Sequence, residues 1–293
     1  MQETTITVDS GIHTRLRWFL SDTLAIARRS AAHIRQTPEK LLDVTMQPLM
    51  FVLLFAFVFG GAMHVGGGSY REYLVGGILV QTIFFGMMGP AISIATDLKE
   101  GVLERFRSLP MSRSAYLFGL ITAEFSAMLL AVVIMTVSGL IVGWGISASV
   151  ASALAGYGLL LLLAALAIWM GTLLGIAVRS PDAVMGLAFI VIFPLTFISS
   201  AFVGTGTLPD GLRQVAEWNP ISAMAAAVRT LFGNPTALPG NAAWPLAHPV
   251  ISSLIACSAM LALMPQPTIR PLTVMITIAR SIAENSAVMS PNR

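Results

Sequence analysis

The sequence predicts an all-α integral membrane protein with six membrane-spanning helices. Hydrophobic residues make up 56 % of the chain and charged residues only 11 %, whereas a soluble domain has about 25 % charged residues. Apolar runs of about 20 residues, the length a helix needs to cross a bilayer, alternate with short charged clusters. These runs are too long for the strands of a membrane barrel, which need about 9–11 residues.

Six apolar runs follow one another along the chain. We expect spans at about 44–63, 74–96, 115–142, 151–178, 183–203 and 246–264. The sixth run is the shortest, because it begins near Trp244 and Pro245 and stops at Pro265. The spans form the predicted membrane domain, residues 44–264, between a cytoplasmic N-terminal segment, 1–43, and a cytoplasmic tail, 265–293.

The N-terminal segment contains an amphipathic helical pattern over residues 14–36. Apolar side chains recur there at spacings of three and four, at Leu16, Leu20, Leu24, Ala27, Ala31 and Ile34. This periodicity is typical of one face of a helix. Arg28, Arg29 and Arg35 suit anionic lipid headgroups. We expect an interfacial helix on the inner leaflet; the alternative is a linker helix packed on the bundle.

The distribution of Lys and Arg predicts the orientation. With the N-terminus inside, fourteen of the 17 Lys and Arg residues lie in cytoplasmic segments. Only Arg71, Arg213 and Arg229 then fall outside. Because cytoplasmic loops of membrane proteins carry an excess of Lys and Arg, both termini are predicted to be cytoplasmic.

The connection 204–245 is predicted to be the long external one. Residues 208–218 have a short amphipathic helical pattern, in which Pro209 suits the first turn. Asn219 and Pro220 break this helix, and residues 221–232 can form a second short helix. Trp218 and Trp244 suit the outer membrane interface.

Several catalytic motifs are absent from the sequence. A nucleotide-binding P-loop needs a lysine after glycine to neutralise phosphates, but the only lysines, Lys40 and Lys99, do not follow glycine. None of the four histidines has a partner at metal-ligand spacing, and there is no nucleophile elbow. No basic stretch is interleaved with aromatics, as nucleic-acid binding would require. We therefore expect neither an enzyme, a bound cofactor nor a nucleic-acid partner.

One acidic residue, Glu124, falls inside a predicted span, about ten residues from its start. Charges within the membrane often mark ion coupling or substrate contact. Because the span is about 28 residues long, Glu124 can also lie at headgroup level or bond to a neighbouring helix. A single acid gives little support to proton-driven antiport.

The densest internal charge cluster is the segment 97–110, between the second and third spans. As a helix it would place Leu98, Val102, Phe106 and Leu109 in one stripe, and Glu100, Glu104 and Arg107 on another face. An interior Gly101 would cost about 1 kcal/mol relative to alanine, and Pro110 would end the helix. Such a helix could dock in a groove of a partner or pack as a solvated loop helix on the span ends.

Three motifs together resemble those of a known family. Residues Asp97 to Arg113, including Glu100-Gly101 and Leu109-Pro110, are similar to the cytoplasmic segment of ABC-2 type exporter permeases, notably the daunorubicin- and doxorubicin-resistance subunits. Residues 179–182, Arg-Ser-Pro-Asp, resemble the second cytoplasmic loop of that family. Residues 208–229, from Leu-Pro through Asn-Pro-Ile-Ser to Arg229, resemble its external segment.

The resemblance implies a permease subunit of an ATP-driven exporter in a bacterial inner membrane. Two such chains, as a homodimer, would pair with two copies of a separate ATPase subunit that binds ATP and Mg²⁺. The 97–110 segment would be the coupling helix that contacts the ATPase. Its predicted coupling residues are Leu98, Glu100, Gly101, Val102, Glu104, Arg105, Phe106 and Pro110.

The resemblance also implies a substrate path at the interface between two chains, usually formed by the second and fifth spans. The predicted path residues are Phe84, Phe85, Met87, Met88, Phe197 and Glu124. This apolar set favours a hydrophobic drug-like or lipid-like substrate. The glycine pairs Gly139–Gly143 and Gly171–Gly175 have the spacing of helix dimerisation motifs or of packing within the chain. An ion-coupled secondary transporter and a non-transporting membrane scaffold are the alternative functions.

Overall fold

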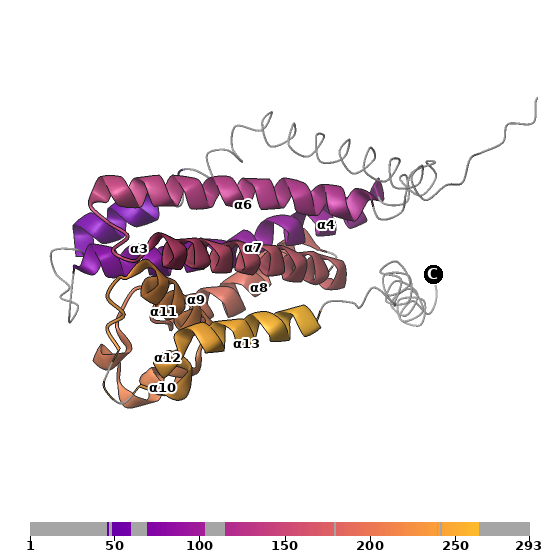
Figure 1. Ribbon diagram of the computed structural model, residues 1–293. Coiled ribbons are helices and arrows are strands. Elements are labelled where there is room, and N and C mark those ends of the chain that lie inside the picture. The colour runs from indigo at the N-terminus through magenta and orange to yellow at the C-terminus, as the bar shows by residue number, and fades with distance from the viewer. Residues whose placement is uncertain are drawn as a thin grey trace, which may run out of the picture.

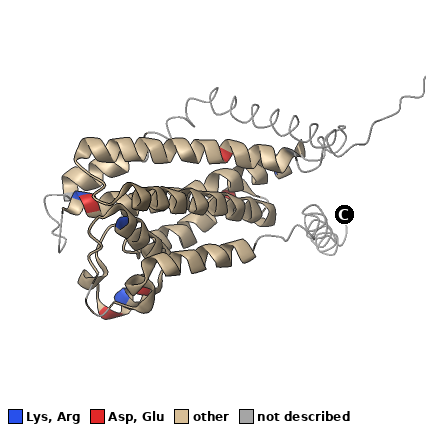
Figure 2. Cartoon of the chain, in the orientation of Figure 1, with Lys and Arg blue, Asp and Glu red and all other residues tan. Residues whose placement is uncertain are grey.

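The computed structural model describes residues 46, 49–59, 69–102, 115–178, 180–238, 240 and 242–263. Throughout these ranges the regular structure is helical, with no strand. The long helices lie side by side, and shorter helices gather at one end and along one side (Figure 1). Charged side chains are sparse along the long helices in Figure 2. This arrangement confirms the predicted all-α class.

Three helical segments are long and apolar enough to cross a membrane, namely Tyr70–Lys99, Tyr116–Val142 and Val150–Val178. They comprise α3 (Tyr70–Gly86) with α4 (Met88–Lys99), then α6 (Ala115–Val142) and α7 (Val150–Val178). Their bounds agree with those of the predicted second, third and fourth spans.

The crossing formed by α3 and α4 is broken at Met87. Pro90 has no N–H to offer the carbonyl of Gly86, and its ring would crowd that carbonyl in a regular helix. At the break itself, the N–H of Met87 bonds to the carbonyl of Phe84, three residues earlier, at 3.4 Å. A proline therefore explains the break.

The described part of the first predicted span is helical, and the last predicted span corresponds to a shorter helix. An apolar helix covers Leu49–Val58 and passes into a π-helical turn, η1 (Phe55–Phe59). At the other end of the chain, α12 (Trp244–Ala247) leads into α13 (Pro249–Ala262). Since a helix rises 1.5 Å per residue, the 14 residues of α13 extend about 21 Å, less than the roughly 30 Å hydrocarbon core.

The predicted fifth span, 183–203, is wrong in its last six residues. The helical path runs through α8 (Pro181–Leu187), the π-turn η2 (Ala188–Ile192) and α9 (Phe193–Phe197). The helix then ends, and residues 198–203 form turns. Pro194 lies at the junction of η2 and α9, where its missing N–H favours an altered helical turn.

The predicted external segment contains η3 (Thr205–Thr207), α10 (Asp210–Trp218) and α11 (Pro220–Phe232). The two expected short helices are therefore present. However, α11 does not lie outside the bundle. Its residues 221–229 are all buried, and it packs against α3, α7 and α13, among which Figure 1 places it.

The glycine pair on α7 packs within this chain. A methyl group added at Gly171 would lie 2.0 Å from the carbonyl oxygen of Met87, and one at Gly175 would lie 2.4 Å from that of Ala91. The backbones of α4 and α7 therefore touch along one helical turn, which only glycine permits. Of the two readings of this motif, the structure supports intrachain packing.

Candidate functional site

The most unusual charged residue in the described chain is Arg229, on α11. Its side chain is fully buried. Nε donates a hydrogen bond to the carbonyl of Tyr73 at 2.7 Å, and Nη2 donates to the carbonyl of Ala201 at 2.8 Å. The guanidinium carbon lies 3.6 Å from the centre of the Tyr73 ring. One side chain thus joins α11, α3 and the turn after α9.

Two adjacent glycines of α3 make room for this side chain. A methyl group on Gly76 would lie 2.8 Å from Cγ of Arg229. On Gly77 it would lie 1.9 Å from the carbonyl oxygen of Ala201 and 2.6 Å from Nη2 of Arg229. The sequence Gly76-Gly77 therefore allows both the arginine and the turn backbone to approach α3.

The irregular backbone after α9 receives hydrogen bonds from tyrosines on α3. The hydroxyl of Tyr73 donates to the carbonyl of Ser200 at 2.5 Å. The hydroxyl of Tyr70 donates to the carbonyl of Phe202 at 3.2 Å. Within a membrane protein, non-helical backbone is tolerated only where the protein itself satisfies its polar groups. These two tyrosines do so for the turn.

Residues at the start of α11 also make hydrogen bonds to the backbone of this turn. The side-chain amide of Asn219 donates to the carbonyls of Leu195, at 2.6 Å, and Ile198, at 3.2 Å. Its oxygen accepts the N–H of Ile221 and so caps α11. The backbone N–H of Ser200 donates to the hydroxyl of Ser222 at 2.8 Å. The Asn-Pro-Ile-Ser motif therefore holds the end of α9 against α11.

The sequence analysis placed Arg229 in the external connection and did not predict its burial among the helices. The signals that could have found it are the small apolar residues around it and the Gly-Gly pair on α3. Its Nη1 atom is buried without a hydrogen-bond partner among the described residues. We name the set Tyr70, Tyr73, Ser200, Ala201, Asn219 and Arg229 the α11 clamp.

The predicted path residues do not form one lining. Phe85, Met87 and Met88 lie together where α3 meets α4, in the apolar cluster shared with α8 and η2. Phe84 is buried in the main core. Phe197 is 40 % exposed and stacks on other phenylalanines of the α9 region.

Glu124 is half-buried on α6 and faces the break between α3 and α4. A methyl group on Gly89 would lie 2.8 Å from Oε2 of Glu124, and one on Gly86 would lie 1.8 Å from the terminal methyl of Met128. Because Glu124 and Met128 are four residues apart, they share one face of α6. The glycines at the break therefore seat α6, and with it Glu124, beside Met87.

The first part of the predicted coupling helix is not a separate helix. Asp97, Leu98 and Lys99 form the last turn of α4, which ends with Glu100 as its cap. Gly101 then has φ of +67°, a left-handed conformation that commonly terminates helices at glycine. The predicted stripe is therefore interrupted between Leu98 and Val102 at Gly101, which is a stop for α4 and not an interior helix position.

The end of α4 is tied to the beginning of α6. The hydroxyl of Tyr116 donates a hydrogen bond to Oδ2 of Asp97. Leu98 packs with Ile94, Leu117 and Leu120, while Glu100 is exposed. The other predicted coupling residues lie outside the described residues; they are Glu104, Arg105, Phe106 and Pro110. The predicted helix 14–36 and the tail 265–293 also lie outside them.

A family profile described as ABC-2 type transporter matches residues 21–232, more than half of the chain. The chain belongs to this family. The match ends at the last residue of α11, so in this ABC-2 chain it includes the α11 clamp and the end of α4. With its long apolar helices, this ABC-2 family member is a multi-pass membrane protein.

Individual relatives of this ABC-2 chain are permeases by name. The daunorubicin resistance ABC transporter permease protein DrrB1 of Streptomyces coeruleorubidus is 29 % identical over 212 residues, covering 72 % of this chain and 75 % of its own length. The doxorubicin resistance permease DrrB of Mycobacterium tuberculosis is 26 % identical, covering 76 % and 80 %. The putative transport permease ycf38 of Porphyra purpurea is 25 % identical, covering 72 % and 73 %.

Proposed function

We propose that this chain is the membrane permease subunit of an ATP-driven exporter and that a separate ATPase subunit binds ATP and Mg²⁺. The observation that carries the proposal is the ABC-2 family match across residues 21–232. The sequence supports ATP binding by a separate subunit, because neither Lys40 nor Lys99 follows the glycine that a P-loop requires. The direction of transport follows the relatives named for drug resistance.

The proposed ATPase contact is the cytoplasmic segment that begins at the end of α4. Glu100 is exposed, and none of the described residues lies within 4 Å of the position a side chain would take at Gly101. A partner could therefore approach the backbone there closely. Since α4 touches the backbone of α7 at Gly175, a displacement of this turn would reach the bundle through α4.

The proposed second permease chain would meet the α8–α9 side of the bundle. There the exposed apolar side chains are Phe189, Ile190, Val191, Phe193 and Phe197. By contrast, α3 is enclosed by its own chain over most of its length and offers little surface to a partner. A contact of this kind would place Phe197 at the interface between the chains.

The proposed cargo is a hydrophobic drug-like or lipid-like molecule. Phe85, Met87 and Met88 supply apolar and polarisable surface near the break between α3 and α4, and Glu124 lies beside it. A carboxylate in such surroundings would favour a cargo with a positive charge. We also infer that the membrane is a bacterial inner membrane, with both termini cytoplasmic.

Co-purification tests the proposal. The tagged chain is expressed with a candidate ABC ATPase, extracted in mild detergent and isolated, alongside Gly101→Trp and Glu104→Lys. We expect the ATPase to accompany the wild type in equal amount and to be lost with both substitutions. Gly101→Asn separates docking from folding, because asparagine tolerates the left-handed conformation. Gly240→Trp, at another open position, should retain the ATPase.

The alternatives predict different outcomes. If the wild type binds no ABC ATPase yet moves substrate when an ion gradient is imposed, the chain is an ion-coupled transporter. If both cytoplasmic substitutions leave binding and export unchanged, the coupling assignment is wrong. A scaffold would retain partner binding without supporting export of any hydrophobic compound.

A further inference from the structure

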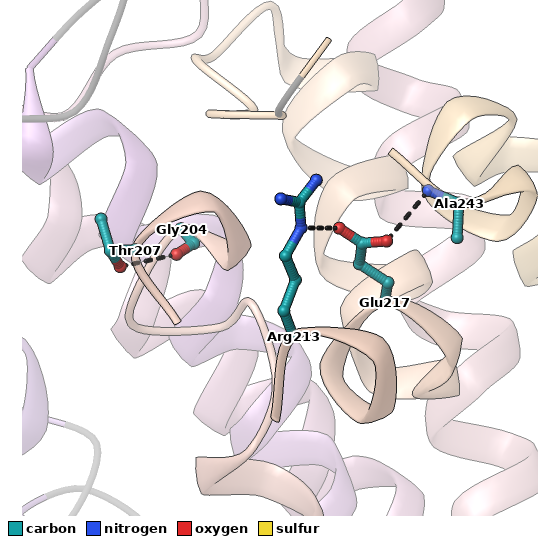
Figure 3. Close-up of polar contacts among 5 residues, drawn as sticks. All are labelled: Gly204, Thr207, Arg213, Glu217 and Ala243. Carbon is teal, nitrogen blue, oxygen red and sulfur yellow. Dashed lines mark hydrogen bonds and ion pairs between the residues drawn. The ribbon is translucent and has the colours of Figure 1, made fainter. Parts of the chain in front are cut away.

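Helix α10 turns its charged side toward its own chain. Nε of Arg213 lies 2.8 Å from Oε1 of Glu217, and the Glu217 side chain is only 8 % exposed. Its second oxygen, Oε2, accepts the backbone N–H of Ala243 at 3.1 Å. Figure 3 shows this chain of contacts from α10 to the segment before α12. The ion pair and the amide therefore fix the orientation of α10.

The apolar side of α10 faces away from the chain. Leu212 is 46 % exposed, Val215 is 56 % exposed and Trp218 is 68 % exposed. Spaced three residues apart, they lie along one side of the helix, opposite the buried Ala216 and Glu217. A helix on a water-soluble protein does the reverse, packing its apolar stripe on the core and turning charge outward.

The flank of α10 is polar and exposed, with Asp210 and Gln214. The helix thus has an apolar face beside a polar edge, the arrangement of helices that lie in the plane of a membrane surface. Trp244, at the start of α12, is 51 % exposed, and tryptophan is enriched at the boundary between headgroups and acyl chains.

We propose that α10 is a lipid-binding helix that inserts Leu212, Val215 and Trp218 into the headgroup–acyl boundary of the phospholipid leaflet at its end of the bundle. Phospholipid is the occupant because α10 packs on α12 and α12 packs on α13, a membrane-type helix on which Ile251, Leu254 and Ile255 are exposed. The bond from Glu217 to Ala243 fixes this anchor to the entry of α13. The proposal does not depend on the ATPase or on the direction of transport.

Site-directed fluorescence tests this placement. In a Cys257→Ser background, Leu212→Cys and Val215→Cys carry an environment-sensitive fluorophore, with Asp210→Cys and Gln214→Cys as matched positions on the polar edge. The protein is reconstituted in phosphatidylcholine vesicles containing lipid spin-labelled at carbon 5 of the acyl chain. We expect the lipid quencher to act at least about threefold more strongly at 212 and 215 than at 214, and iodide to show the opposite order.

Two outcomes overturn the proposal. Iodide quenching at 212 and 215 equal to that at 214 would place the face in water. Protection from both quenchers would mean that protein, such as a second copy of the chain, covers it. A second measurement needs no cysteine variant: brominated phosphatidylcholine should quench wild-type tryptophan fluorescence more than that of Trp218→Tyr, and equal quenching would also overturn the placement.

Discussion

Arg229 on α11 stacks over the ring of Tyr73 on α3 and donates a hydrogen bond to the backbone of the same residue. The cation is completely buried, so its desolvation must be offset by these contacts. Tyr73 in turn donates to the carbonyl of Ser200. The pair therefore fixes a short helix inside the bundle and also satisfies the irregular backbone after α9.

Arg229→Lys should destabilise the protein more than Arg229→Met. Lysine keeps a buried charge but lacks the planar fork that reaches both carbonyls, whereas methionine removes the charge together with its desolvation cost. We expect the lysine variant to lose at least about 2 kcal/mol. Thermal unfolding in detergent, followed by tryptophan fluorescence, measures this.

The control for this experiment is Arg213→Lys. Arg213 is 22 % exposed within its ion pair, and partly exposed pairs contribute about 0–1 kcal/mol. The unfolding temperature of the Arg213→Lys variant should therefore stay near that of the wild type. An Arg229→Lys variant as stable as the wild type would mean that the clamp is not required for the fold.

Gly171→Ala should disrupt the packing of α7 against the break at Met87, whereas Gly158→Ala on the same helix should be tolerated. The added methyl group would collide with the carbonyl of Met87 in the first case and meet nothing within 4 Å in the second. Alanine at Gly158 should even gain about 1 kcal/mol of helix propensity. Yield of monodisperse protein and its unfolding temperature distinguish the two, and equal behaviour would contradict the packing described.

Tyr116→Phe should loosen the C-terminal end of α4, since it removes the hydrogen bond to Asp97. A hydrogen bond to a charged group contributes about 1.5 kcal/mol or more, equivalent to about tenfold in an opening equilibrium. Amide hydrogen exchange of residues 95–102 should therefore accelerate about tenfold. Tyr157→Phe, which loses a bond to Thr136 elsewhere on α6, should leave exchange in this segment unchanged.

Glu124→Gln should reduce export of a cationic hydrophobic dye by about tenfold and leave export of a neutral dye unchanged. The substitution preserves the shape next to Gly89 while removing the charge that attracts a cation. Asp182→Asn, an exposed acid in the first turn of α8, is the control and should affect neither dye. Equal loss for both dyes would assign Glu124 a role in packing instead.

The long spans could be predicted from the sequence because a single run of apolar residues decides each of them. α6 and α7 begin and end within one residue of the expected bounds. The end of span five at Phe197 could not be predicted so directly. Pro194 was visible, but the side chains that satisfy the turn after it come from Tyr73 and Asn219.

The depth of α11 depends on contacts distant in sequence. Its composition predicts a helix, yet 13 residues are too few to cross a bilayer. Its burial follows from the space at Gly76 and Gly77, more than 140 positions earlier in the chain. Apolar periodicity predicts Gly101 inside a helix, because periodicity does not report the sign of φ. The same apolar spacing also fits a helix that stops there.

The contact between Gly175 on α7 and the carbonyl of Ala91 on α4 involves no side chain on either partner. Side-chain contacts can adapt by changing rotamers, but two touching backbones can only slide or separate. We therefore expect α4 and α7 to move as a single lever, with the break at Met87 as its natural pivot relative to α3. During a transport cycle, relative motion should then concentrate between this lever and its neighbours α6 and α13.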